Sequence, residues 1–489
     1  MESNQTDSLS QRPVFWLIIV IAIFFLKGVF LSVLLPLFQG PDEQTHYATI
    51  QYLSESKEKS WPIVTKKSIP EKNNIATYHF SQEIIKSAQI TQFDEIISQR
   101  ENTQEFSNSI QGLDENELLE NHWKRYIDIY PVNTSGYSSF YYSVASALEK
   151  SFPDQSILFR FFMIRLISVF LGVAIVWLCY LTTRKIGLSS MQSLTIATLI
   201  AFQPMFSATA AIVNIDISLI FSFSLFTYAS VSLLKDSFRL MHILLLFFSL
   251  VLAFFSKGPG IVLFIIVQPL LVYLAYKHFK VNPRKFFWFI FLGVSVVIGS
   301  FFLAVPKDYL ISLTNLGAIS KFNSPAESLS KYIEKTTAFG ALKDMHASYW
   351  GNFGWLDTKI PSAVLDVIWI VEIISLLGII LFIFSKKKIE YLPNKKFILF
   401  SIGILAALQL AIRFYDWRVF DTTGKIIIGT PGRYFLPNII PHILLVVTGL
   451  GFFTKNEKQF NVLIKVLAIL MILLSLYSIF DVIIPRYYL

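Results

Sequence analysis

Two adjacent carboxylates follow the first long apolar stretch of the chain. This stretch covers residues 14–38, and Asp42 and Glu43 come a few residues later. Because a run of this length can cross a hydrocarbon core of about 30 Å, both carboxylates are expected at the depth of the lipid headgroups. A carboxylate at that depth can act as a general base, or bind a metal ion, beside the phosphate of a lipid-linked molecule. The competing interpretation is an ordinary solvated loop that begins after a helix.

Three further titratable residues could serve such chemistry. His46 comes three residues after Glu43, and it could complete a divalent-cation site or be a plain polar residue of the loop. Lys257 stands in a glycine-containing connection, where it could neutralise a phosphate or merely extend toward the membrane surface. Arg433 opens a late apolar stretch, and its fork of N–H donors suits a phosphate, although arginines commonly flank membrane spans.

An acidic and two aromatic residues complete the candidates. Asp216 could pair with one of the cations or contact a substrate directly. Trp350 and Trp355 could offer flat faces to a sugar ring, or belong to the aromatic belt of a membrane interface.

The composition shows that these residues must be positioned by membrane helices. Of the 489 residues, 54% are hydrophobic and 15% are charged, and the mean hydropathy is +0.56. A soluble chain of this size would carry more surface charge, so the sequence predicts an all-α polytopic membrane protein. Eleven stretches are long and apolar enough to be spans: 14–38, 157–183, 188–206, 210–234, 240–256, 259–276, 286–306, 362–385, 396–414, 433–453 and 461–484.

The charges of the connections predict how these spans are oriented. If the N-terminus is cytoplasmic, the short inside connections are all basic, as the positive-inside rule requires. Acidic residues outnumber basic ones in residues 39–156, whereas the rest of the chain is basic. The net charge of +9 therefore reflects membrane orientation, and it gives no support to nucleic-acid binding.

This orientation divides the chain into five parts. They are the cytoplasmic N-terminus with the first span (1–38), a mainly helical exoplasmic subdomain (39–156), spans two to seven (157–306), a second exoplasmic loop (307–361) and spans eight to eleven (362–489). The first span has no small-residue cleavage site behind it, so we expect it to be retained and not removed as a signal peptide.

Reactive groups inside the spans are few. Cys179 is the single cysteine, so the sequence predicts a buried, inert thiol and neither a disulfide nor a thiolate metal cluster. Glu372 is the one ionisable side chain expected near the centre of a span, where it would pair with a neighbouring helix. A transporter would place its polar groups deeper. Charges gathered near the outer face instead favour chemistry on a lipid-borne substrate.

Short motifs lie in order along nearly the whole chain. They are Gly40-Pro41-Asp42-Glu43 with His46, Tyr141-Tyr142, Arg165-Leu166-Ile167-Ser168-Val169, Gln203-Pro204, Asn214-Ile215-Asp216, Ser256-Lys257-Gly258, residues 350–357, and Gly432-Arg433-Tyr434 with Pro437. Together they resemble the C-type (GT-C) membrane glycosyltransferase superfamily. The likeness is closest to a bacterial family of uncharacterised predicted membrane proteins within it.

The resemblance implies a sugar donor carried on a polyprenyl phosphate or diphosphate and used at the outer face of the bacterial cell membrane. The acceptor would be a cell-envelope glycan or glycolipid. Asp42 would activate the acceptor hydroxyl or hold a divalent cation, with Glu43 as its helper or second ligand. Lys257 and Arg433 would neutralise the leaving phosphate, and in-line displacement would invert the anomeric centre.

Two other functions stay open on the sequence alone. The chain could transport or flip a lipid-linked sugar, although charges at one face leave no gate on the other. It could also be a catalytically silent partner in envelope assembly. The sequence indicates no oligomeric state.

Overall fold

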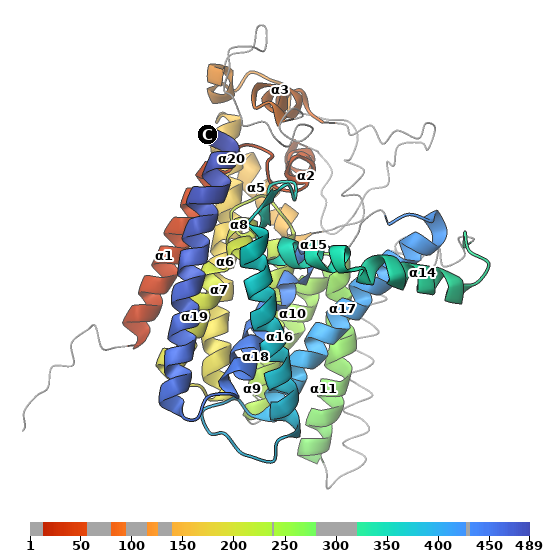
Figure 1. The fold of residues 1–489 in the computed structure, drawn as a ribbon. Coiled ribbons are helices and arrows are strands. Elements are labelled where there is room, and N and C mark those ends of the chain that lie inside the picture. Colours follow the sequence, from red (N-terminus) through yellow and green to blue (C-terminus); the bar gives the residue numbers. More distant parts are fainter. Residues whose placement is uncertain are drawn as a thin grey trace, which may run out of the picture.

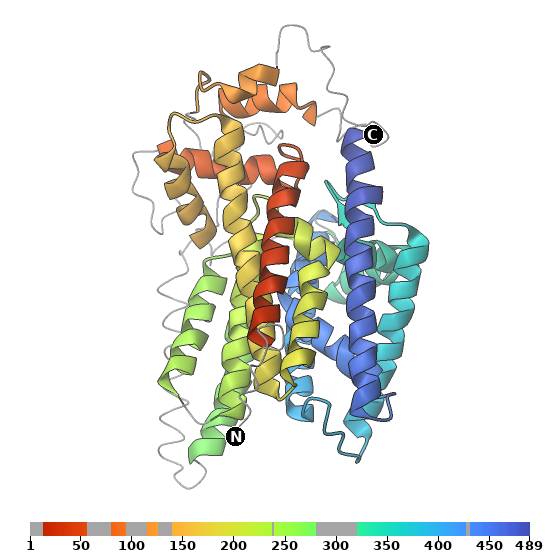
Figure 2. The same cartoon turned by 90° about the vertical axis from the view of Figure 1, so that its left-hand side faces the viewer.

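The computed structural model describes residues 13–55, 80–93, 115–125, 139–236, 239–279, 320–426 and 431–489, which form a bundle of helices (Figures 1 and 2). In this part of the chain, seven helical segments are long and apolar enough to cross a membrane. They are α1 (Pro13–Leu34), α6 (Ile157–Ile186), α9 (Asp216–Lys235), α16 (Ser362–Phe384), α17 (Lys395–Thr423), η6 with α18 (Gly432–Asn438 and Ile439–Gly451), and α19 with η7 and α20 (Glu457–Tyr477, Ser478–Ile483 and Ile484–Tyr488).

Shorter apolar helices coincide with three more of the expected spans. They are α7 (Ser190–Phe202), α10 (Leu240–Phe254), and η4 (Gly258–Ile261) continued by α11 (Val262–Phe279). The expected span 286–306 lies outside the described residues. The prediction of a mainly helical membrane protein is confirmed. The described part of the chain has seven full-length spans, where the sequence suggested eleven in all.

The expected span 188–206 is broken near its end. A proline begins a separate short helix, α8 (Pro204–Thr209), and Gln203 stays extended and caps it through its side chain. Lys27 of α1 reaches this break, where its Nζ donates to the carbonyl of Ala201 at 2.6 Å and to Oγ of Ser207 at 2.8 Å. The expectation that Glu372 is the one ionisable group inside a span is therefore wrong, because Lys27 lies within α1.

The helices differ in how much of their surface the protein covers. About 89% of the apolar segment of α9 is buried, against 22% for α16 and 28% for α1. The exposed apolar surfaces suit lipid contact. Small residues allow close helix packing in the interior, since a Cβ at Gly378 of α16 would lie 2.0 Å from the carbonyl of Gly449 in α18.

Short helices cover one end of the bundle (Figure 2). They are α2 (Glu43–Glu55), α3 (Gln82–Ile90), the 3-10 helix η2 (Glu115–Leu119) and α5 (Phe140–Ser151). Arg160 of α6 contacts the carboxylates of Glu83 in α3 and Glu149 in α5, and the hydroxyl of Tyr47 in α2 donates to Glu149 at 3.1 Å. Burial raises the pKa of both carboxyls, that of Glu83 to about 7. This buried network fixes α2 on the bundle.

A second group of elements lies across the same end. These are α14 (Pro325–Thr337), α15 (Phe339–Trp350) and an antiparallel hairpin of β1 (Asn352–Phe353) and β2 (Thr358–Lys359), with Asn352 opposite Lys359 (Figure 1). The C-terminal ends of α6, α9, α16 and α18, which lead into the short basic connections, lie at the other end. The described parts of the long connections and the short basic ones are thus separated by the length of the bundle.

Candidate functional site

A buried arginine holds the turn between α1 and α2. Arg165 of α6 donates to the carbonyls of Ser32 at 2.8 Å, Leu35 at 2.6 Å and Pro36 at 3.0 Å. It thereby satisfies acceptors that the end of α1 leaves open. The same guanidinium binds both carboxylate oxygens of Glu43, at 2.9 and 2.8 Å. The end of one helix and the start of the next are therefore tied to a single side chain.

Glu43 is a structural anchor. Its side chain is fully buried, and its oxygens also accept from the backbone N–H groups of Gly40 at 3.0 Å and Val213 at 2.8 Å. A buried carboxylate is tolerated only when it is paired in this way. The expectation that Glu43 assists catalysis or binds a metal ion is corrected, because Arg165 and two N–H groups already occupy both oxygens.

Asp42 has the opposite environment. Its side chain is 54% exposed, and its backbone φ of +59° lies in the left-handed region that residues other than glycine rarely adopt. Phe38, at the start of the same turn, also has a positive φ, of +63°. Such strain persists only where the surroundings enforce it, and it is concentrated at functional sites. The turn that Glu43 anchors therefore presents the Asp42 carboxylate to solvent.

Arg433 of η6 faces Asp42 from a distant part of the sequence. Its Nη2 lies 3.5 Å from Oδ2 of Asp42. The residue is only 7% exposed, yet its Nε and Nη1 have no hydrogen-bond partner within the described residues. Leaving buried donors unpaired is costly. These two nitrogens can therefore receive an anion, such as a phosphate, without giving up an existing contact.

A second cation, Lys257, lies just before η4 and pairs with Asp216, the first residue of α9. The Nζ of Lys257 lies 2.6 Å from Oδ1 of Asp216 and 4.5 Å from the ring centre of Tyr434. The same ring lies 5.5 Å from the guanidinium carbon of Arg433. The backbone N–H of Asp216 donates to the side chain of Asn214 at 2.7 Å. Asp216 thus pairs with a cation, which is one of the two roles that the sequence left open.

His46 is the neutral member of the group. Its Nδ1 lies 2.5 Å from the hydroxyl of Tyr142 in α5. Burial lowers the pKa of His46 to about 4, because an imidazolium would lose its hydration, while Asp42 and Asp216 raise it and the two neighbouring cations lower it. His46 is therefore uncharged near pH 7, so it can form hydrogen bonds there without adding a positive charge.

The two tryptophans do not join this group. Trp350 is buried, and its Nε1 donates to Glu372 at 3.1 Å, so the expectation that its face holds a sugar is corrected. Trp355 is partly buried, with its Nε1 donating to the carbonyl of Phe38 at 3.1 Å and its ring 5.9 Å from that of Phe93. Trp355 therefore stabilises the strained turn through its hydrogen bond to Phe38.

The residues present do not fit a cation site shared by Asp42 and Glu43. The Glu43 oxygens are occupied by Arg165, while Asp42 is exposed next to Arg433. Among the described residues, no group of three or more histidine, cysteine, aspartate or glutamate side chains could hold a metal ion. In this part of the chain, the cations next to Asp42 and His46 are Arg433 and Lys257.

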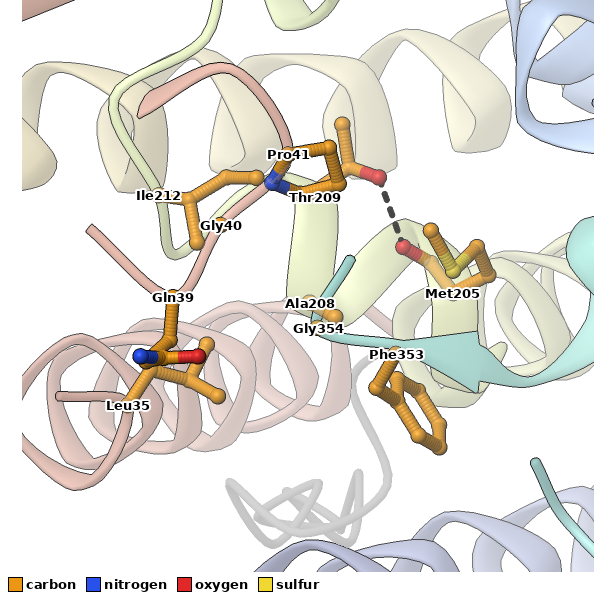
Figure 3. Close-up of a pocket in the computed structure, with 10 residues that line it drawn as sticks. All are labelled: Leu35, Gln39, Gly40, Pro41, Met205, Ala208, Thr209, Ile212, Phe353 and Gly354. Atoms are coloured by element: carbon orange, nitrogen blue, oxygen red, sulfur yellow. Dashed lines mark hydrogen bonds between the residues drawn. The ribbon is translucent and has the colours of Figure 1, made fainter. Parts of the chain in front are cut away.

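A small cavity adjoins the same turn (Figure 3). It is lined by Leu35, Gln39, Gly40, Pro41, Met205, Ala208, Thr209, Ile212, Phe353 and Gly354. Its volume of about 10 Å³ admits roughly one water molecule. The Nε2 of Gln39 is buried without a partner in the described part of the chain. A sugar does not fit here, so a substrate has to approach Asp42 from its exposed side.

Sequence reasoning named Arg165, Tyr142 and Tyr434 only as parts of motifs, without a role. One signal was present for Arg165, which lies in an apolar helix and therefore requires a buried partner. The choice of Glu43 as that partner needs the fold, since the two residues are 122 positions apart. The contacts of Tyr142 and Tyr434 likewise depend on helices that the sequence does not place side by side.

Comparisons with known proteins place the chain in a family. A family model described as a predicted membrane protein (DUF2142) matches residues 24–443, which is most of the chain, so the protein belongs to the DUF2142 family. This confirms the expected membership of an uncharacterised membrane-protein family.

No curated protein matches the chain. Among solved structures, the chain is similar to an oligosaccharyltransferase of Archaeoglobus fulgidus tethered with an acceptor peptide, at 12% identity and a TM-score of 0.41. The likeness covers 96% of this chain but 56% of that enzyme.

Proposed function

We propose that this member of the DUF2142 family is a membrane glycosyltransferase. It transfers a sugar from a polyprenyl-phosphate-linked donor to a hydroxyl of a cell-envelope glycan or glycolipid. One observation carries the proposal. The exposed carboxylate of Asp42, held in a strained turn, lies beside the buried Arg433, whose Nε and Nη1 have no partner in the described structure. A base next to cationic N–H donors that can bind a phosphate is what displacement of a sugar from a phosphate requires.

Asp42 serves as the general base of this reaction. As the acceptor oxygen bonds to the anomeric carbon, its proton passes to the Asp42 carboxylate. The bond between that carbon and the phosphate oxygen breaks, and its electron pair leaves with the phosphate. The single displacement inverts the anomeric centre. The anchored turn fixes the carboxylate before substrate arrives, which reduces the entropy lost on reaching the reactive geometry.

Arg433 and Lys257 stabilise the phosphate that leaves. The phosphate gains negative charge as the bond breaks, so donors aimed at it bind the transition state more strongly than the ground state. Arg433 contributes its unpartnered Nε and Nη1. Lys257 already pairs with Asp216, so part of its charge is compensated before substrate binds. His46 stays neutral and contributes hydrogen bonds only.

The position of the site supports chemistry at the outer face. Asp42 and α2 lie at the end of the bundle that is covered by α3 and α5 (Figure 2). The short connections at the opposite end are basic, which favours a cytoplasmic location for that end. The site then faces the compartment in which envelope glycans are exposed.

Purified protein in proteoliposomes tests this function. The assay supplies polyprenyl-phosphate sugars with a labelled sugar, together with an extract of envelope glycans and glycolipids. Transfer predicts loss of label from the lipid and its appearance in a new glycoside. Movement of intact labelled lipid across the bilayer, with no new glycoside, would instead identify a transporter. Folded protein that does neither with any donor would contradict the proposal and favour an assembly role.

A further inference from the structure

A second group of titratable side chains, apart from Asp42, lies where α15 packs against the membrane helices α16 and α18. The oxygens of Glu372 in α16 accept from Nε1 of Trp350 at 3.1 Å and lie 3.1 Å from Nε2 of His442 and 2.9 Å from Nε2 of His346. The hydroxyl of Tyr349 lies 2.8 Å from Nδ1 of His442. Trp350, Tyr349 and His346 belong to α15, and His442 belongs to α18. One carboxylate therefore joins three helices.

The contacts of Glu372 are consistent with an ionised carboxylate. The indole N–H of Trp350 can only donate, and a His442 imidazole with hydrogen on Nε2 also donates. The Nε2 of His346 lies 2.9 Å from the carboxylate but is not aligned to form a hydrogen bond within the described residues. With that tautomer at His442, its Nδ1 accepts from the Tyr349 hydroxyl. A carboxylate inside membrane helices is costly, and such residues are usually retained for function. The proposed transfer reaction uses none of these side chains directly.

Helix α15 connects this cluster to the site. Gly432, which precedes Arg433, packs directly on α15, since a Cβ there would lie 1.9 Å from the carbonyl of Met345 and 2.6 Å from the N–H of Tyr349. The N–H of Gly432 donates to Oγ of Ser348. The stretch of α15 that contacts Glu372 therefore also contacts the residue before Arg433.

We propose that His346, Glu372 and His442 form a positioning cluster for Arg433. The Glu372 carboxylate fixes α15 against α16 and α18, and α15 in turn fixes the Gly432 backbone, so that the unpartnered nitrogens of Arg433 are held ready for the donor phosphate. Glu372 is a positioning residue and contacts no reacting atom. The inference rests on the proposed function, because it assigns phosphate binding to Arg433.

A double-mutant cycle on the binding of polyprenyl phosphate tests the cluster. Removal of one charge-assisted contact typically costs about 1.5–3 kcal/mol, so we expect Arg433→Gln to raise Kd about 100-fold and Glu372→Gln about 10-fold. Because Glu372 acts through Arg433, the double variant should bind like Arg433→Gln alone. If the increases in Kd of the two single variants multiply in the double variant, the proposal is overturned. An unchanged Kd in Glu372→Gln would also overturn it. Glu390→Gln, in an exposed connection, is the matched control.

Hydrogen–deuterium exchange separates this inference from the proposed function. In Glu372→Gln, exchange should rise together in the peptides that cover 345–351 and 431–438 and stay unchanged in 43–55. Glu372→Asp, which keeps the charge, should restore part of the protection. If wild-type protein binds no polyprenyl phosphate, the proposed function fails, yet the coupled exchange would still support the positioning of Arg433 by the cluster. Unchanged exchange in 431–438 would overturn it.

Discussion

Asp42 and Glu43 are adjacent, chemically similar and placed in opposite environments. The Glu43 side chain is fully buried against Arg165, while the Asp42 side chain is 54% exposed beside Arg433. The two residues adjoin at the start of α2, where Asp42 has a φ of +59° and Glu43 is the first helical residue. One carboxylate thus stabilises the turn, and the other is available for proton transfer.

At the residue scale, the burial of His46 makes stability depend on pH. Its folded pKa of about 4 lies below the ordinary 6.5, so the unfolded state binds the proton more readily between these values. The free energy of unfolding should therefore be retained above pH 6.5 and fall as the pH drops toward 4. Relative to His46→Asn, wild type should lose about 3 kcal/mol between pH 7 and pH 4. Unfolding in detergent at both pH values measures this, and equal acid sensitivity of the two proteins would contradict a neutral, buried His46.

At the element scale, the site depends on how helix ends are held. The turn after α1 is fixed by Arg165, and the start of η6 is fixed by α15. Asp42 lies in a turn and Arg433 lies in a short 3-10 helix, so no long regular helix fixes either side chain. Their positions therefore follow from contacts with residues far away in the sequence, and those contacts are the places to perturb.

Arg165→Gln should destabilise the protein strongly. It leaves Glu43 as a buried carboxylate without its counter-charge and leaves the last carbonyls of α1 without their donor. Loss of one partner of a buried ion pair typically costs about 3–5 kcal/mol. Thermal unfolding in detergent measures the effect, with Arg184→Gln at an exposed position as the control. A variant as stable as wild type would show that the Glu43 anchor is not needed.

Gly432→Ala should displace η6 from α15. The added Cβ would overlap the carbonyl of Met345, and overpacking of this kind costs about 1–3 kcal/mol. We therefore expect weaker binding of polyprenyl phosphate together with lower stability. Gly403→Ala is the matched control, because nothing lies within 4 Å of a Cβ there. If both variants bind polyprenyl phosphate equally well, the packing of Gly432 does not affect phosphate binding by Arg433.

At the scale of the whole molecule, the sequence predicted the membrane spans better than the contacts between side chains of different helices. Hydropathy is a local property, so the apolar runs and the ends where Asp42, Asp216 and Lys257 lie could be found directly. The roles of Glu43 and Trp350 depend instead on contacts between distant helices. A buried carboxylate and an exposed one look alike in sequence. The structure brings four charged candidates and His46 together, and it directs Glu43 and both tryptophans elsewhere.

The orientation of the bundle can be tested by labelling introduced cysteines. Cys179 is the single native cysteine and is buried, so the background should be low. Asp154 lies in the connection between α5 and α6, and Glu390 lies in the basic connection between α16 and α17; both are exposed. The first connection is at the end of the bundle that carries the site, and the second is at the other end (Figure 1). In intact cells, a membrane-impermeant maleimide should label Asp154→Cys alone. Labelling of Glu390→Cys alone would place the site in the cytoplasm.

The most direct test of the central claim compares wild type with Asp42→Asn. The measurement is the rate at which sugar leaves a polyprenyl-phosphate donor and appears on an acceptor, in reconstituted protein. Loss of a general base typically costs 10²–10⁴-fold in rate, so Asp42→Asn should be slower by at least about 100-fold while still binding polyprenyl phosphate. Asp154→Asn, an exposed aspartate away from the site, should transfer at the wild-type rate. Undiminished transfer by Asp42→Asn would contradict the account, because no base would then act from this turn.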